Sequence, residues 1–157
     1  MRFLTWNASG LLKNGVNQAK ADWLLSYLNN HSDIAALAIQ ETHCQNIDRF
    51  CQAIHDISDK YTVVHSFPVD GDEWAGIMII ISKEYEIISQ HNIIEGRVLC
   101  VRIKSLIYQT EMDVFAVYGY PAGRQPWIHK MGDAIDNLIP TMILILFLVH
   151  LTESQTQ

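Results

Sequence analysis

The sequence has no apolar run long enough to cross a membrane, because a spanning helix requires about 20 apolar residues. Its longest such run, from Thr141 to Leu151, is far shorter. We expect this run to form a buried strand, with a membrane-surface tail as the alternative. The N-terminus also lacks a charged segment followed by a long apolar one, the pattern of a secretory signal. The expected location is therefore intracellular, either nuclear or cytoplasmic.

Cysteine is scarce as well. The three residues Cys44, Cys51 and Cys100 form an odd set, and their spacings match no zinc motif. We expect them to be small, buried apolar residues, as in a protein from a reducing compartment.

Positively charged residues are also few. The sequence has 11 Lys and Arg against 17 Asp and Glu, which gives a formal net charge of −6. Nonspecific binding to nucleic acids depends on Lys and Arg that neutralise phosphates, so the net charge argues against a broad, charge-driven binding mode. A divalent cation held by carboxylates would add positive charge that this count omits. Enzymes that process nucleic acids with the help of a metal therefore stay compatible with the sequence.

The remaining composition is that of a globular domain. Of the 157 residues, 49% are hydrophobic and 18% charged, and neither repeats nor low-complexity runs interrupt them. A chain of this length can bury roughly two thirds of its unfolded surface, which is enough for a core.

The first third of the chain has the pattern of a βαβ unit. A short apolar strand at Arg2–Trp6 precedes an amphipathic helix from about Asn14 to Asn30, and a fully apolar strand follows at Ile34–Ile39. Such strands are parallel, with a right-handed crossover, so their carboxyl ends lie at one edge of the sheet. Asn7 and Glu41 each follow such an end, where ligands of α/β sheets generally bind.

The rest of the chain favours antiparallel strands between two further helices, which predicts an α/β or α+β fold with a mixed sheet. Helices are expected at about 46–58 and 127–138, and strands at 61–66, 76–82, 85–91, 97–107, 111–118 and within 141–151. In the strand at 97–107, Leu99, Val101 and Ile103 alternate with Cys100, Arg102 and Lys104, so one face should meet solvent or substrate.

Glu41 is the candidate metal ligand, because Mg²⁺ prefers oxygen ligands and is usually held by one or two carboxylates with substrate phosphate oxygens. The amide of Asn7 would orient a phosphate oxygen or a water. Each residue also has an ordinary alternative: Glu41 as a surface acid, and Asn7 as the residue that opens a turn.

Several motifs occur in the order in which they occur in the endonuclease/exonuclease/phosphatase superfamily. The sequence most resembles the endonuclease domains of LINE-type retrotransposons and the exonuclease III-type apurinic endonucleases. The motifs are Thr5-Trp6-Asn7-Ala8-Ser9-Gly10-Leu11, Leu37-Ala38-Ile39-Gln40-Glu41-Thr42-His43, Trp74-Ala75-Gly76-Ile77, Gly96-Arg97-Val98-Leu99 and Ala116-Val117-Tyr118-Gly119.

The resemblance implies a partial four-layer α/β sandwich of the DNase I-like type, with a mixed, mostly antiparallel sheet. It also implies Mg²⁺- or Mn²⁺-dependent cleavage of phosphodiester bonds in DNA. In this reading Glu41 is a metal ligand and Asn7 an active-site amide at the metal, while Tyr118 contacts the scissile phosphate. His43 and Arg97 would lie near the substrate backbone, or else have structural or solvent roles.

The sequence departs from the superfamily after residue 140. The Asp-x-Asn motif and the distal Asp-His pair have no counterpart, and the apolar run occupies the place of the first. The resemblance thus implies a C-terminally truncated domain at 1–140, followed by a divergent apolar strand and polar tail at 141–157. Tyr120 is an alternative to Tyr118.

Without those motifs we expect very low activity, because general-base assistance alone is typically worth about 10²–10⁴ in rate. A non-catalytic remnant or partner-binding fragment is one alternative, and a lipid or inositol phosphate phosphodiesterase or phosphatase is another. Apolar strands left uncovered would favour self-association.

Overall fold

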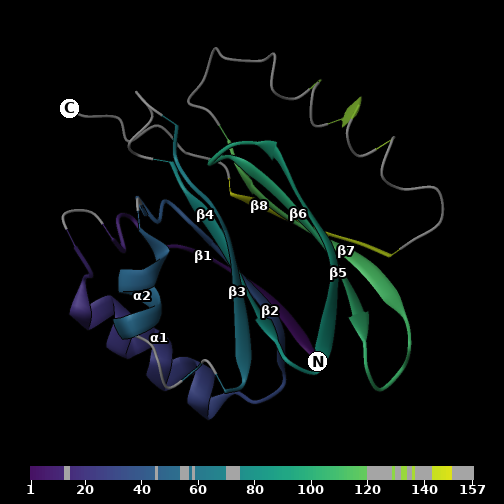
Figure 1. Cartoon of the computed structure of the whole chain (residues 1–157), viewed down its shortest axis with the longest axis horizontal. Helices are drawn as coiled ribbons and strands as arrows, with labels where there is room; N and C mark the ends of the chain where they lie inside the picture. Colours follow the sequence, from purple (N-terminus) through teal and green to yellow (C-terminus); the bar gives the residue numbers. More distant parts are fainter. Residues whose placement is uncertain are drawn as a thin grey trace.

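The chain forms two stacked β-sheets, with helices on the outer face of the first sheet (Figure 1). The computed structural model describes residues 1–12, 15–44, 46–53, 57, 59–69, 75–119, 129, 132–133, 136 and 143–149. Its elements are β1 (Arg2–Asn7), α1 (Gln18–Asn30), β2 (Ile34–Gln40), α2 (Ile47–Ala53), β3 (Tyr61–Ser66), β4 (Ile77–Ser82), β5 (Tyr85–Ile94), β6 (Val98–Ser105), β7 (Glu111–Tyr118) and β8 (Ile143–Val149).

The first sheet has the strand order β1-β2-β4-β3, and its β1–β2 pair is parallel. The crossover between these two strands is α1, so the βαβ unit predicted from the sequence is confirmed. Its helix begins later than expected, at Gln18 instead of Asn14. The Asn17 side chain caps it by accepting a hydrogen bond of 3.2 Å from the backbone N–H of Lys20.

The second sheet has the strand order β5-β6-β7-β8, with two antiparallel pairs followed by a parallel pair of β7 and β8. Each sheet is therefore mixed and mostly antiparallel, as predicted. The apolar run after residue 140 does form a strand, β8. The helix predicted at 127–138 falls largely outside the described residues, and the domain boundary at residue 140 stays a prediction.

The main core lies between the two sheets. The first sheet contributes Ala36, Ala38 and Ile79 to it, and alternate residues of β2 and β4, such as Leu37 and Ile80, pack instead on the helical side. This accounts for the uninterrupted apolar runs of β2 and β4, which are buried on both faces.

The expectation that one face of β6 meets solvent or substrate holds for Arg102 and Lys104, which are partly exposed, but is wrong for Cys100. Leu99, Val101 and Ile103 face the first sheet, as their alternation predicted. The opposite face does not simply meet solvent, because Cys100 is buried there in an apolar cluster with Phe115.

The ring of His65 on β3 is half-buried, 4.2 Å from the ring of Phe67. Burial lowers the pKa of His65 from its ordinary value of 6.5, although nearby Asp48 acts in the opposite direction. The unfolded chain thus binds this proton more readily than the folded one, so stability should fall as the pH drops below about 6.5.

We expect His65→Gln to reduce the fall in the free energy of unfolding at low pH, measured by urea unfolding between pH 5 and pH 8. His91→Gln, at an exposed position of β5, is the matched control and should leave the slope unchanged. A slope that is unaffected by His65→Gln would contradict the prediction.

Candidate active site

Asn7 and Glu41 meet at the carboxyl-end rim of the first sheet. Asn7 is the last residue of β1, and Glu41 directly follows β2. The amide nitrogen Nδ2 of Asn7 donates a hydrogen bond of 2.7 Å to Oε1 of Glu41. The amide oxygen of Asn7 accepts a hydrogen bond of 3.0 Å from the backbone N–H of Ser9. The adjacency that the parallel pair predicted is therefore present in the fold.

The loops that carry this pair have unusual backbone conformations. Ser9, Glu41 and His43 have φ angles of 44°, 51° and 52°, in the left-handed region that residues other than glycine rarely adopt. Backbone hydrogen bonds hold the two loops side by side, from Gly10 N–H to the carbonyl of Glu41 (2.8 Å) and from Leu12 N–H to that of Thr42 (2.9 Å). Such strain often accumulates at functional sites, where the surrounding structure maintains it.

The second sheet contributes a second pair, Arg97 and Tyr118. The guanidinium carbon of Arg97 lies 4.5 Å from the centroid of the Tyr118 ring, within the range of a cation–π interaction. Nη1 of Arg97 also donates a hydrogen bond of 2.8 Å to the carbonyl of Gly119. Both side chains are buried, with exposed fractions of 4% each, so Arg97 supports the tyrosine at the end of β7.

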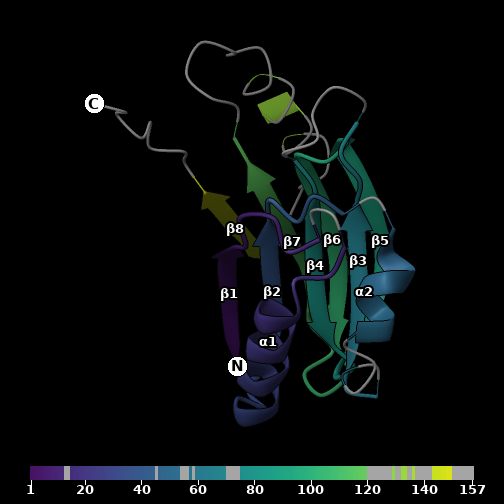
Figure 2. The ribbon, with the colours of Figure 1, turned by 90° about the vertical axis from the view of Figure 1, so that its left-hand side faces the viewer.

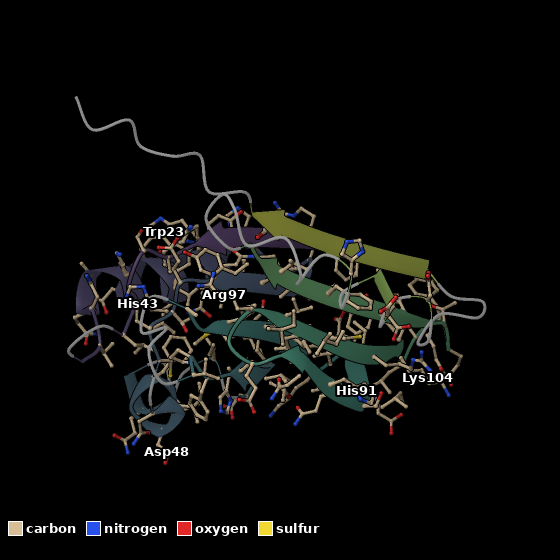
Figure 3. The ribbon with its side chains drawn as sticks, turned by 90° about the horizontal axis from the view of Figure 1, so that it is seen from above. Trp23, His43, Asp48, His91, Arg97 and Lys104 are labelled. Atoms are coloured by element: carbon tan, nitrogen blue, oxygen red, sulfur yellow. The ribbon has the colours of Figure 1, made fainter. Side chains whose placement is uncertain are left out.

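A continuous series of backbone hydrogen bonds connects the two pairs. Thr42 N–H donates to the carbonyl of Gly76 (3.1 Å), Gly76 N–H donates to Gly96 (3.0 Å), and Tyr118 N–H donates to Arg97 (2.8 Å). His43 and Arg97 accordingly lie at the same end of the sandwich in Figure 3, far from Lys104. The rim therefore combines residues from both sheets, as the predicted site requires.

Two contributors to this rim were not recognised in the sequence. Lys20 of α1 is one of them: its ammonium donates to the backbone carbonyls of Ala8 (2.5 Å) and Ser9 (2.8 Å), directly after Asn7. Gly76 has a φ of 103°, and a Cβ added there would lie 2.5 Å from Oγ1 of Thr42. Neither contact has a signature in the sequence, because each depends on how distant segments pack.

The carboxylate oxygens of Glu41 suit a hard divalent cation such as Mg²⁺ or Mn²⁺, whereas Asn7 turns its NH₂ group to Glu41 and its amide oxygen to Ser9 N–H. Glu41 is partly exposed, so its carboxylate is accessible from the rim. Among the described residues, no group of three or more His, Cys, Asp or Glu side chains could hold a metal ion. In the described part of the chain, Glu41 is the carboxylate that we expect to hold a cation at this rim, with waters and a phosphate in the remaining positions. Tyr120 lies outside the described residues.

The fold and the rim together define a class of protein, in which two mixed sheets form a sandwich with a cluster of polar side chains at one end. Solved structures of endonuclease/exonuclease/phosphatase proteins have this same fold, and the chain adopts their DNase I-like architecture. The resemblance seen in the sequence is thus confirmed at the level of the fold.

Three of these structures illustrate the match. TDP2 of D. rerio, solved with a single-strand DNA product, is 16% identical, with a TM-score of 0.64 over 90% of this chain and 57% of its own. The AP endonuclease LMAP of Leishmania major is 20% identical, with a TM-score of 0.59 over 87% and 48%. An endonuclease/exonuclease/phosphatase family protein of Bacteroides thetaiotaomicron is 10% identical, with a TM-score of 0.62 over 86% and 58%.

This chain thus spans roughly half to three fifths of the length of the proteins that it resembles in structure. No protein-family model and no curated protein matches its sequence. Within the described part of the chain, no helix is both long and apolar enough to cross a membrane.

Proposed function

We propose that the chain carries the metal- and phosphate-binding portion of a metal-dependent DNA phosphodiesterase of the retrotransposon or repair type, with very low turnover in its present form. The observation that carries this proposal is the hydrogen bond between Asn7 and Glu41 at the carboxyl ends of two parallel strands. The DNA-processing proteins with the same fold support the choice of DNA as substrate.

Each residue has a distinct part in this proposal. Glu41 holds Mg²⁺ or Mn²⁺, and the Asn7 amide fixes the orientation of the Glu41 carboxylate through its donated hydrogen bond. Tyr118 contacts the scissile phosphate, with Arg97 packed over its ring to hold the phenol in place. His43, two residues after Glu41, lies near the substrate backbone. When bound, the cation supplies positive charge beside the phosphate, which a chain with a net charge of −6 otherwise lacks.

We expect very low turnover because the Asp-x-Asn motif and the distal Asp-His pair of the superfamily have no counterpart in this sequence. Phosphodiester hydrolysis needs a group that activates water as well as a group that stabilises the developing charge. In the part of the chain that the structure describes, Glu41 is not grouped with two further acids or histidines. We therefore expect the protein to bind DNA together with the cation measurably, while it cleaves the DNA very slowly.

The test measures binding and cleavage separately. We expect Mn²⁺ to bind the protein, with the binding followed by electron paramagnetic resonance, and to increase the affinity for a single-stranded oligonucleotide. Glu41→Gln keeps the shape of the side chain but removes its charge, and should weaken Mn²⁺ binding by about tenfold or more. Plasmid nicking by the purified protein should be slow, metal-dependent and absent in the same variant.

Glu86→Gln provides a matched control, because Glu86 is an exposed acid on β5 that takes no part in the rim. It should bind Mn²⁺ as the unmodified protein does. Equal loss in the two variants, or no Mn²⁺ binding at all, would overturn the metal site. Metal binding without any nicking would leave the non-catalytic remnant as the correct function.

The proposed setting is intracellular, nuclear or cytoplasmic, where DNA is found. All three cysteines have free thiols, which is consistent with a reducing compartment. Cys44 and Cys100 are buried as expected, but Cys51 is exposed, so the expectation was wrong for that residue.

A further inference from the structure

The loop that follows β3 begins at the same edge of the first sheet as Glu41. Figure 2 shows the strands of this sheet in the order β1, β2, β4, β3 from left to right. Because β2 and β3 both run antiparallel to β4, they run in the same direction, and their carboxyl ends share one edge. In the register of these pairs, Ile77 of β4 faces Gln40 on one side and Ser66 on the other. Phe67 therefore follows its strand as Glu41 does, two strand spacings or roughly 10 Å away.

A groove of about 590 Å³ lies beside this loop, and its volume is typical of a site for a small organic group. It is lined by the apolar residues Phe67, Pro68 and Val69, and by the polar side chains of Asn92 and Glu95, which are both exposed. Phe67 and Val69 are each 41% exposed, so apolar surface is open to a ligand. We call this site the Phe67 groove.

The apolar part of the Phe67 groove is held in place by the turn before β6. The N–H of Gly96 donates a hydrogen bond of 2.8 Å to Oγ of Ser66. A Cβ added at Gly96 would lie 2.8 Å from the carbonyl oxygen of Phe67 and 2.9 Å from Cα of Pro68, so the two backbones pack tightly. The rings of His65 and Phe67 also meet in a T-shaped arrangement, with their centroids 4.2 Å apart. The Phe67 ring is thus exposed yet constrained, which lowers the entropy cost of binding a ligand.

The chemistry of the Phe67 groove suits a nucleobase and not a phosphate. The carboxylate of Glu95 would repel a phosphate, because both are negatively charged. An exposed aromatic ring, in contrast, is a surface on which the bases of single-stranded DNA stack. At the edge of a base, Glu95 can accept a hydrogen bond from an exocyclic amino group, and the Asn92 amide can both donate and accept. Thymine has no exocyclic amino group, so the groove should discriminate against it.

We propose that the Phe67 groove binds one base of a single-stranded DNA whose phosphate lies at Glu41, and that it prefers a base with an exocyclic amino group over thymine. This specificity site rests on the proposed function, because the rim binds the phosphate of the same strand. At a rise of about 3.4 Å per stacked nucleotide, the bound base lies at most about three nucleotides from the rim. A chain with a net charge of −6 thus gains affinity for DNA from stacking and from the edge of a base.

Fluorescence anisotropy of the full chain with labelled oligodeoxycytidylate and oligothymidylate, at low salt, with and without Mn²⁺, tests the proposal. The unmodified protein should bind oligodeoxycytidylate more tightly. Phe67→Ala should weaken the binding of both oligonucleotides by about tenfold, because it removes the stacking surface. It should leave Mn²⁺ binding unchanged in electron paramagnetic resonance. Glu95→Gln should bring the affinities for the two oligonucleotides together, since an amide can also donate to the carbonyl oxygens of thymine.

Tyr108→Ala is the matched control for Phe67→Ala, because Tyr108 is an aromatic residue, 72% exposed, in the turn that follows the far end of β6. Glu86→Gln is the matched control for Glu95→Gln, since Glu86 is an exposed acid on β5 outside the groove. The two glutamate variants change the net charge equally, so only the base preference should separate them. Neither control should change that preference.

Equal effects of Phe67→Ala and Tyr108→Ala would overturn the Phe67 groove, as would equal affinity of the unmodified protein for the two oligonucleotides. A base preference that survives Glu95→Gln would also overturn it. If the protein binds oligonucleotides through Phe67 but does not bind Mn²⁺, the proposed function fails and the groove stands. Mn²⁺ binding with an oligonucleotide affinity that is independent of Phe67 gives the converse result. No binding of either oligonucleotide, with or without Mn²⁺, would overturn both.

Discussion

Replacing Arg102 with alanine is expected to lower the free energy of unfolding by about 2–4 kcal/mol. Nε of Arg102 donates to Oδ1 of Asp113 at 2.8 Å, and Nη2 donates to Oδ2 at 2.9 Å. The two residues face each other across β6 and β7, and Asp113 is only 1% exposed. Removing the guanidinium would leave a buried carboxylate without its bidentate partner, which costs more than the ion pair itself contributes.

Urea unfolding of Arg102→Ala, Asp113→Ala and the double variant tests this reasoning. The double variant should be more stable than Arg102→Ala, because it no longer buries an unpaired charge. Lys104→Ala is the matched control. Lys104 pairs with Glu111 two residues further along the same strands, where both residues are partly exposed. Lys104→Ala should therefore lower the free energy of unfolding by no more than about 0.5 kcal/mol. Similar losses at positions 102 and 104 would contradict the prediction.

The βαβ unit was predictable because it depends on local patterns. The alternation of a short apolar strand, an amphipathic helix and a fully apolar strand determines which strands are parallel and which ends coincide. Asn7 and Glu41 directly follow these ends, so their meeting could be predicted from the sequence and is confirmed.

The boundary of α1 was harder to predict. Val16 fits the helical spacing of the following residues, yet it precedes the helix, because Gly15 has a φ of 114° and Asn17 caps the first turn. Capping by a side chain satisfies N–H groups that the helix leaves unpaired, and here it outweighed the apolar spacing.

The remaining contacts of the rim could not be predicted. Arg97 lies over Tyr118, and Lys20 donates to the carbonyl of Ala8, because the sheets and helix bring distant segments together. The buried face at Cys100 was missed for the same reason, since alternation shows that two faces differ but not what covers either. The roles of Asn7, Glu41, Tyr118, His43 and Arg97 in catalysis or binding stay predictions.

Gly76→Ala should disturb both stability and the proposed metal site, because Gly76 has a left-handed backbone conformation and lies very close to the Thr42 side chain. Its φ of 103° is one that residues with a Cβ rarely adopt, and the added Cβ would lie 2.5 Å from Oγ1 of Thr42. Thr42 is fully buried and its Oγ1 accepts a hydrogen bond of 3.3 Å from Cys44 N–H, so it has little freedom to move. The two effects together should cost about 2–4 kcal/mol.

Gly15→Ala separates these two causes, because Gly15 has a similar φ of 114° and no heavy atom within 4 Å of the added Cβ. It should show the backbone cost alone, about 1–2 kcal/mol. Gly76→Ala should in addition weaken Mn²⁺ binding, since the Gly76 carbonyl accepts from Thr42 N–H directly after Glu41. Combining Gly76→Ala with Thr42→Ala removes the steric contact and should recover part of the stability. Equal destabilisation by Gly76→Ala and Gly15→Ala, with unchanged Mn²⁺ affinity, would show that the turn does not hold Glu41 in place.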